Sequence, residues 1–317
     1  MSGLLLEVKN LKSYFYTYDG VVRAVDGVSF YVKEGESFGL VGETGCGKSV
    51  TALSVMRLLD PPGEILDGEI LFEGRDLLKL SEDEMQKLRG NKISMIFQDP
   101  MASLNPLMKV GEQIAEVLKG EGNGEREKIV ELLKLVRMPS PERVVNSYPF
   151  ELSGGMRQRV MIAMMVASNP RLLIADEPTT ALDVTTQAQI LNLLKEMKDK
   201  LGLSIWLITH DLGVVAEFCD RVCVMYAGKV VECGSIKEIF KNPLHPYTQG
   251  LLASLPTIER KVDKLRSIPG TVPDLINPPS GCRFHPRCDK AFAPCFDVPP
   301  EEVKVSESHR VFCHLYL

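Results

Sequence analysis

One loop of this 317-residue chain has the residue types and the spacing that hold a nucleotide phosphate. Gly42-Glu-Thr-Gly-Cys-Gly-Lys-Ser49 places four free residues between two glycines, followed by Lys and Ser. Glycines let backbone N–H groups converge on phosphate oxygens, and a helix that begins at Lys48 points its positive dipole end at the same anion. We expect Lys48 to reach the β- and γ-phosphates and Ser49 to ligate Mg²⁺. The predicted nucleotide-binding residues of this loop are Gly42, Thr44, Gly45, Cys46, Gly47, Lys48, Ser49 and Val50.

A pair of carboxylates further along the chain suits the transfer of a phosphoryl group to water. Leu172-Leu-Ile-Ala-Asp-Glu177 is an apolar run that ends in two acidic residues. Asp176 is expected to hold Mg²⁺ through water, and Glu177 to orient the attacking water or accept its proton. Metal neutralisation and activation of the nucleophile are separate tasks, so two adjacent carboxylates can divide them.

Buried strands and the helices between them must position these motifs. The alternation of predicted strands and helices favours an α/β fold with a mostly parallel sheet. The apolar run 172–175 is typical of a strand buried on both faces. Strands are expected at 4–11, 28–32, 37–41, 68–72, 93–97, 172–175 and 204–209, and helices at 48–59 and 185–201. An inserted helical subdomain is predicted for about residues 100–168, and a Pro-, Cys- and His-rich region begins near Pro243.

Composition and charge exclude several classes of function. The net charge of −5 gives no basic footprint for nucleic acid. We find no run of about 18 apolar residues that would predict a transmembrane helix. The start, MSGLLLEVKN, lacks the cationic and apolar regions of a signal peptide. The protein is therefore expected in the cytoplasm, where it can associate with the cytoplasmic face of the cell membrane through partners.

A third motif lies between the first two and resembles the signature sequence of ABC (ATP-binding cassette) ATPases. It is Leu152-Ser-Gly-Gly-Met156, although the family more often has Gln at the last position. In the same order as in that family, Phe97-Gln98-Asp99 resembles the Q-loop, residues 180–183 the D-loop, and Thr209-His210-Asp211 the switch-histidine region. The resemblance covers about residues 4–255. It implies a P-loop ATPase fold of the ABC type with an antiparallel β subdomain.

The resemblance also implies a role for each matching residue. Lys48, Gln98, Glu177 and His210 would be catalytic, with Gln98 sensing Mg²⁺ and linking the site to a membrane subunit. Ser49, Gln98 and Asp176 would bind Mg²⁺. Ser153, Gly154 and Gly155 would contact the ATP held by a facing subunit, and Asp183 would communicate across that dimer. An aromatic residue would stack on adenine: spacing favours Phe15, and its neighbours Tyr14 and Tyr16 are the alternatives.

The C-terminal region narrows the resemblance to the ATPases of oligopeptide and dipeptide importers. Residues 243–256, 269–273 and 282–288 carry the similarity. It implies an ATPase domain over 1–255 and a C-terminal module over 256–317. It further implies a second ATPase subunit, identical or related, two transmembrane permease subunits and an external peptide-binding protein. Nickel or another small solute is an alternative cargo, and a non-transport ABC ATPase is the alternative class.

Four cysteines near the C-terminus have a spacing that leaves their role open. Cys282, Cys288, Cys295 and Cys313 can hold Zn²⁺ or an iron–sulfur cluster, or remain reduced thiols. The resemblance favours a [4Fe–4S] cluster, with Zn²⁺ second. Possible alternative ligands are His285, His309 and His314. We expect no disulfides in a reducing compartment and expect Cys219, Cys223 and Cys233 to be small buried hydrophobic residues.

Overall fold

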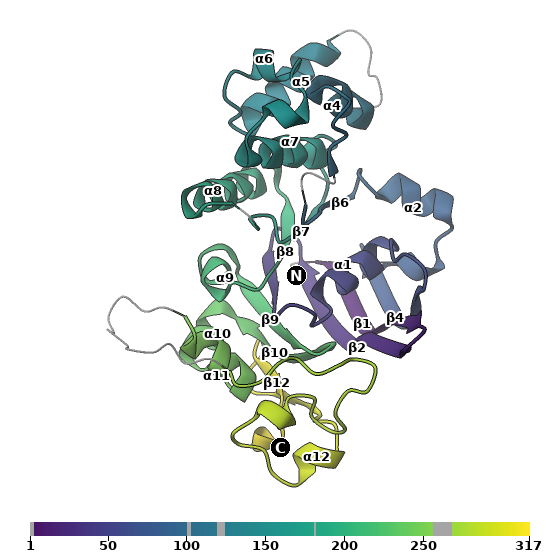
Figure 1. The fold of residues 1–317 in the computed structure, drawn as a ribbon, viewed down its shortest axis with the longest axis vertical. Helices are drawn as coiled ribbons and strands as arrows, with labels where there is room; N and C mark the ends of the chain where they lie inside the picture. The colour runs from purple at the N-terminus through teal and green to yellow at the C-terminus, as the bar shows by residue number, and fades with distance from the viewer. Residues whose placement is uncertain (1–2, 100–102, 119–123, 181, 256–267) are drawn as a thin grey trace. The chain divides into compact units, whose positions relative to one another are not determined.

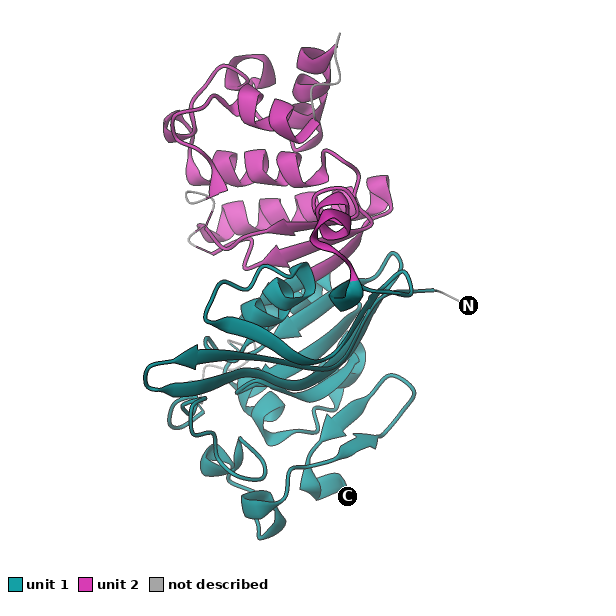
Figure 2. Cartoon of the chain, turned by 90° about the vertical axis from the view of Figure 1, so that its right-hand side faces the viewer, with its two compact units in different colours: residues 1–79, 207–317 teal, residues 80–206 magenta. Residues whose placement is uncertain are grey.

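A computed structural model describes residues 3–99, 103–118, 124–180, 182–255 and 268–317 of the chain. It divides into two compact units, residues 1–79 with 207–317 and residues 80–206 (Figure 2). Three parts of the predictions lie outside the described residues. They are the first residues of the predicted helical subdomain, Ala181 of the D-loop, and the start of the predicted C-terminal module at residue 256. The predicted domain boundary at residue 255 stays a prediction, and both of its sides belong to the first unit.

An antiparallel sheet occupies the N-terminal part of the first unit. Its strand order is β2 (Gly20–Lys33), β1 (Leu4–Thr17), β4 (Gly63–Phe72) and β5 (Arg75–Asp76). Alternating apolar residues of β1 and β2 are buried on one face, as expected for a sheet with a single covered face. This sheet is the antiparallel β subdomain implied by the family resemblance.

A second set of strands in the first unit holds the phosphate loop. β3 (Ser37–Val41) pairs in parallel with β9 (Arg221–Tyr226), and β9 pairs antiparallel with β10 (Lys229–Ser235). The C-terminal region adds β12 (Arg310–Phe312) to β10 and β11 (Glu302–Lys304) to β12, both antiparallel. The parallel pair expected for the mostly parallel sheet is present, and β9–β10 together with the two C-terminal strands makes the pairing in this unit mixed.

Short helices complete the first unit (Figure 1). α1 runs over Lys48–Met56 and stops before the predicted Leu59, because Arg57 adopts a left-handed conformation with φ 51°. The remaining helices are η1 (Leu77–Lys79), α9 (Leu212–Phe218), α10 (Ile236–Lys241), α11 (Pro246–Ala253), η3 (His285–Arg287), α12 (Pro294–Asp297) and η4 (His314–Tyr316).

The second unit combines two parallel strands with the helical insertion. β6 (Ile93–Ile96) and β7 (Leu172–Asp176) pair in parallel. α7 (Gly154–Val166) packs against β6, α8 (Val184–Leu201), α4 (Val110–Leu118) and α5 (Glu125–Leu135). The described residues of this unit also form α2 (Glu82–Leu88), α6 (Pro141–Val144) and η2 (Pro149–Glu151), and β8 (Ser204–Thr209) contains the boundary between the units. Among the described residues, no helix has the length and apolar character needed to cross a membrane.

One expectation about the cysteines is wrong. Cys223 of β9 and Cys233 of β10 form a disulfide rather than staying reduced. The two residues face each other in the antiparallel ladder, with their Cα atoms 4.1 Å apart, and directly opposed residues in such a ladder bring their Cβ atoms close together. The third cysteine of this group, Cys219, is buried, as expected, and lies outside the disulfide.

Candidate functional site

The phosphate loop joins β3 to α1, as the sequence predicts. Gly45 and Gly47 have φ angles of 82° and 93°, which only glycine adopts readily. A Cβ on Gly47 would lie 2.1 Å from the carbonyl oxygen of Ala24, so the loop backbone also passes too close to β2 for a side chain. Because Gly47 is the N-cap of α1 and has no side chain, it leaves the first turn of the helix open to an external anion.

Lys48 is held inside this loop. Its side chain is buried, and Nζ donates to the carbonyl oxygens of Gly42 at 2.8 Å and Glu43 at 3.0 Å. Cys46 and Gly47 are also buried, Ser49 and Val50 are half-buried, and Thr44 and Gly45 are exposed. The predicted nucleotide-binding residues of this loop therefore lie together, with Lys48 at its centre.

In the second unit, Glu177 follows β7 in a conformation that its neighbours stabilise. Its φ is 46°, in the left-handed region that is unfavourable for a non-glycine residue. The Gln98 amide nitrogen donates to Oε2 of Glu177 at 3.2 Å, and the Thr180 hydroxyl donates to the same oxygen at 2.8 Å. Asp176, the preceding residue, is buried at the end of β7. The structure thus brings together Gln98 and Glu177, which the sequence assigned to separate motifs, and adds Thr180.

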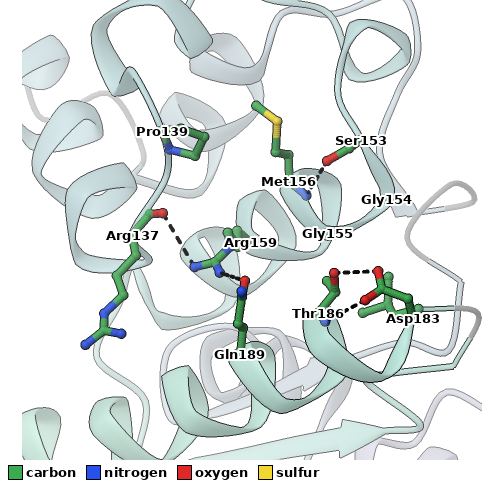
Figure 3. A pocket seen from close by; sticks show the side chains of 11 residues that line it. Arg137, Pro139, Ser153, Gly154, Gly155, Met156, Arg159, Asp183, Thr186 and Gln189 are labelled. Carbon is green, nitrogen blue, oxygen red and sulfur yellow. Dashed lines mark hydrogen bonds between the residues drawn. The ribbon is translucent and has the colours of Figure 1, made fainter.

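The signature residues line a pocket of about 570 Å³ in the second unit (Figure 3). Ser153 caps α7 by accepting from the Met156 N–H at 3.4 Å. A Cβ on Gly155 would lie 2.7 Å from Cγ2 of Thr186, so this glycine permits the close packing of α7 on α8. Asp183 lines the same pocket. Four predicted residues, Ser153, Gly154, Gly155 and Asp183, therefore lie around one cavity.

Asp183 has a local task that sequence reasoning missed. It caps α8: its carboxylate accepts from the Thr186 N–H at 2.9 Å and from the Thr186 hydroxyl at 2.6 Å. The side-chain hydrogen bond from Thr186 is the main cause that lowers the pKa of Asp183. An Asp three residues before a Thr at a helix start was the available sequence signal.

A further residue of the pocket also escaped the sequence analysis. Arg159, one turn beyond the signature, donates to the Val136 carbonyl oxygen at 2.8 Å. It also donates to Oε1 of Gln189 at 3.1 Å (Figure 3). It connects the signature helix to the end of α5 and to α8. The hydrogen bonds join residues that are 23 and 30 positions apart, so no local pattern indicated them.

The remaining predicted ATP contacts lie in the first unit. His210 is exposed at the end of β8, and the following Asp211 caps α9. Of the three candidate adenine-stacking residues, Tyr14 donates its hydroxyl to Asp26 at 2.9 Å, and Tyr16 is exposed. A Cβ on Gly63 would lie 2.6 Å from the Phe15 ring, so that ring packs directly on β4. The assignment of Phe15 to adenine stays a prediction.

The four C-terminal cysteines lie close enough for their thiols to interact electrostatically. Burial, with a smaller effect of the other three thiols, raises the pKa of Cys282 to about 11. Burial likewise raises the pKa values of Cys288 and Cys313. The Cys282 N–H donates to the Cys295 carbonyl oxygen at 2.9 Å. Even so, no set of three or more His, Cys, Asp or Glu side chains within the described ranges is arranged to hold a metal ion.

The histidines considered as alternative ligands have other partners. A ring nitrogen of His309 lies 2.8 Å from the buried carboxylate of Glu232. His314 contacts the Val298 carbonyl oxygen at 2.8 Å, and His285 contacts the Cys282 carbonyl oxygen at 3.0 Å. The imidazoles therefore serve the packing of the C-terminal region.

A strand–phosphate loop–helix unit, a carboxylate pair after a buried strand and a signature helix define an ABC-type ATP-binding cassette. The family profile described as ABC transporter matches residues 25–180. A second profile, described as oligopeptide/dipeptide transporter, C-terminal region, matches residues 231–295. The oligopeptide transport ATP-binding protein OppD of Bacillus subtilis is 57% identical over 97% of this chain and 87% of its own. The dipeptide transport ATP-binding protein DppD of Lactococcus lactis is 52% identical over 96% of this chain and 89% of its own.

Solved structures give the same class. The ATP-binding cassette MJ0796, in a dimeric post-hydrolysis state bound to ADP and Pi, matches 73% of this chain and 98% of its own with a TM-score of 0.65 and 30% identity. The cbiO1 protein of Clostridium perfringens matches 75% of this chain and 91% of its own, with a TM-score of 0.65 and 31% identity. The chain belongs to the family of ABC transporter ATP-binding proteins and is an ATPase.

Proposed function

We propose that this chain hydrolyses ATP to power the import of dipeptides or oligopeptides through a membrane ABC transporter. The observation that carries the proposal is the C-terminal region of residues 231–295, which matches the oligopeptide/dipeptide transporter type. Two relatives whose names state peptide transport cover nearly the whole chain at 52% and 57% identity. ATP and Mg²⁺ are the cofactors usual for this family.

Each residue of the proposed ATP site has a distinct task. Lys48 and the loop backbone bind the phosphates, and Ser49, Gln98 and Asp176 are the candidates to hold Mg²⁺, an ion that prefers oxygen ligands. Glu177 orients the attacking water and accepts its proton. The Gln98 amide donates to one carboxylate oxygen of Glu177, which supports a role for Gln98 in controlling this base.

The working unit that we propose contains two cassettes. Ser153, Gly154 and Gly155 lie at the start of a helix and line an open pocket, which suits contact with an ATP that a facing subunit binds. His210 contacts the γ-phosphate, and Asp183 communicates between the two cassettes. Two permease subunits and an external peptide-binding protein complete the transporter, with this chain on the cytoplasmic face of the membrane.

The proposal also includes a [4Fe–4S] cluster on Cys282, Cys288, Cys295 and Cys313, with Zn²⁺ as the alternative. Cysteine thiolates are donors that both groups accept, and binding either group would require these four side chains to move from their positions in the structure, where they form no metal site. Protein purified without oxygen should show a broad absorption band near 400 nm and about four irons and four sulfides per chain. A colourless protein that contains one zinc per chain would favour the alternative, a zinc site, over the cluster. A metal-free, folded protein would remove the metal from the proposal.

Cells that lack this chain provide the test of transport. Uptake of labelled di- and oligopeptides is compared in the parent strain, the deletion strain, and deletion strains that carry the wild-type chain or Glu177→Gln. Peptide uptake should be lost on deletion and restored only by the wild-type chain. Nickel uptake is measured in the same strains as the control. Loss of nickel uptake with intact peptide uptake would overturn the peptide assignment.

A further inference from the structure

Glu43, the second residue of the phosphate loop, is bound at its amide, its carbonyl and its side chain. Its N–H donates to the Tyr247 hydroxyl at 2.9 Å, and its carbonyl oxygen accepts from Lys48 Nζ at 3.0 Å. Its carboxylate receives the Arg287 guanidinium through two hydrogen bonds, of 2.7 and 3.1 Å. Tyr247 and Arg287 come from the C-terminal region, more than 200 residues further along the chain. The loop is therefore held from outside the motif that defines it.

Arg287 is itself held firmly in its place. Its Nε donates to the Pro269 carbonyl oxygen at 2.7 Å, and its guanidinium lies 5.6 Å from the centre of the Tyr226 ring. The side chain is only 6% exposed, compared with 29% for the Glu43 carboxylate. A part-buried two-point contact between Arg and a carboxylate fixes direction as well as distance. The pair is thus a rigid link rather than a surface ion pair.

The Tyr247 contact is equally fixed. Tyr247 is fully buried, and its ring packs at 4.7 Å from the Tyr226 ring and 5.3 Å from the Phe284 ring. Its N–H donates to Nδ1 of His245, the residue that caps α11. The hydroxyl that receives the Glu43 N–H is therefore positioned by a packed aromatic cluster.

A parallel link reaches the loop near Cys46. The Arg283 guanidinium donates to the Ala227 carbonyl oxygen and forms an ion pair with Asp26. Gly228, which follows Ala227, donates its N–H to the Cys46 carbonyl oxygen at 2.9 Å. Its own carbonyl oxygen accepts from the Asp26 N–H at 2.8 Å. Two arginines of the segment 282–288 thus support the phosphate loop at two points.

We propose that Arg287 is a positioning residue of the ATP site. It sets the geometry of the phosphate loop through Glu43, with Tyr247 fixing the same residue from its amide. The charge of Arg287 also neutralises a carboxylate inside a loop that must receive a polyanion, because an uncompensated negative charge there would repel the phosphates. The C-terminal module is therefore part of the ATP-binding apparatus. This inference rests on the proposed use of the loop for ATP.

The test measures ATP affinity and turnover separately, on the intact purified chain. Arg287→Ala should raise the Kd of a fluorescent ATP analogue with Mg²⁺ by roughly 10-fold or more, the range expected for a lost charge-assisted contact. The ATPase KM should rise in parallel, while kcat at saturating ATP stays within about two-fold. The double variant Glu43→Gln/Arg287→Ala should recover part of the affinity, because it removes the exposed charge.

Two further variants separate positioning from folding. Arg310→Ala is the matched control: Arg310 forms an ion pair with Glu302 and donates to the Ser29 carbonyl oxygen, away from the loop. Its ATP affinity should match the wild type. Arg287→Lys keeps the charge and loses the two-point contact, so its affinity should fall between those of the wild type and Arg287→Ala; it also serves if Arg287→Ala fails to fold. Unchanged affinity in both Arg287 variants, or equal loss in Arg310→Ala, would overturn the proposal. A wild-type chain that binds no ATP would instead overturn the ATP site itself.

Discussion

The phosphate loop and the Glu177 turn are both built after buried strands, but they are stabilised in different ways. The phosphate loop follows β3 and relies on glycines at positive φ and on close backbone contacts with Ala24 and Gly228. Glu177 follows β7 and adopts a positive φ without being glycine. Side-chain hydrogen bonds from Gln98 and Thr180 stabilise its carboxylate. The loop proposed to bind phosphate is thus held by close backbone contacts and by the long-range contacts of Glu43, whereas the turn proposed to activate water is held by two local side-chain hydrogen bonds.

This difference suits the two tasks. A binding loop gains affinity when its N–H groups need no rearrangement on contact with phosphate. A base that must act only when nucleotide and metal are correctly placed gains from contacts that can be exchanged for new ones. A non-glycine residue in a left-handed conformation costs roughly 1–3 kcal/mol, which the surrounding contacts must offset. Because Glu177 lies outside the phosphate loop, substitution in its turn should alter the chemical step more than ATP binding.

The largest effect is expected from removing the base. Glu177→Gln keeps the size of the side chain but cannot accept a proton, so kcat should fall by roughly 10²–10⁴-fold. ATP affinity should stay near the wild-type value, because the phosphate loop is unchanged. Steady-state hydrolysis measures the expected fall in kcat, and equilibrium binding of a fluorescent ATP analogue measures the expected unchanged affinity. Turnover near the wild-type rate would remove Glu177 from its assigned role.

The reciprocal change is expected to act on binding. Lys48→Ala removes the buried ammonium that lies at the centre of the loop. Because contacts to charged groups contribute about 1.5–3 kcal/mol each, ATP affinity should fall by roughly 10–100-fold. The measurement is again the Kd of the ATP analogue. If Lys48→Ala lowered kcat and left the Kd unchanged, the assignment of ATP binding to the phosphate loop and of the chemical step to the Glu177 turn would be wrong.

A smaller effect is expected at Thr180, which sharpens the description of the Glu177 turn. Thr180→Val removes one hydrogen bond to the base and keeps the shape of the side chain. Loss of a hydrogen bond that contributes about 1 kcal/mol to the positioning of Glu177 should lower kcat roughly 5-fold. The Kd for ATP should stay unchanged. Thr180→Ser, which retains the hydroxyl, is the control and should restore kcat. Equal rates in all three proteins would show that Gln98 alone suffices.

The smallest effect is a pH dependence of the free energy of unfolding that arises from His245, the residue that accepts from the Tyr247 N–H. Complete burial lowers the pKa of His245 to about 4, below its value of about 6.5 in an unfolded chain. The unfolded state then binds more protons, so this contribution to stability is complete above pH 6.5 and is lost as pH falls toward 4. From pH 7.5 to 5.5 the free energy of unfolding should drop by about 1 kcal/mol.

Urea unfolding followed by circular dichroism at both pH values measures that drop. His245→Asn keeps an acceptor for the Tyr247 N–H but has no titrating group, so its stability should depend less on pH than that of the wild type. An identical pH dependence in the two proteins would exclude His245 as the source.

Sequence reasoning was strongest where function depends on local patterns. The phosphate loop, the buried strand before Asp176 and the signature helix are read from spacing and apolar runs, and the structure has each at the predicted place. The contacts missed were tertiary ones. Arg287 pairs with Glu43 across 244 residues, and Arg159 with Gln189 across 30. The Cys223–Cys233 disulfide was missed because its formation depends on strand register, which the isolated sequence leaves open.

The distance along the chain between Glu43 and Arg287 has a consequence for protein synthesis. At about 5–20 residues per second, Glu43 is made roughly 12–49 s before its partner 244 residues later. A nascent chain therefore carries the motif that recognises ATP long before it carries the arginine that holds that motif in place. Full nucleotide affinity should be acquired only after residue 287 has been synthesised and has paired with Glu43. Premature stop codons before position 287 should consequently yield chains that fold in part but compete poorly for cellular ATP.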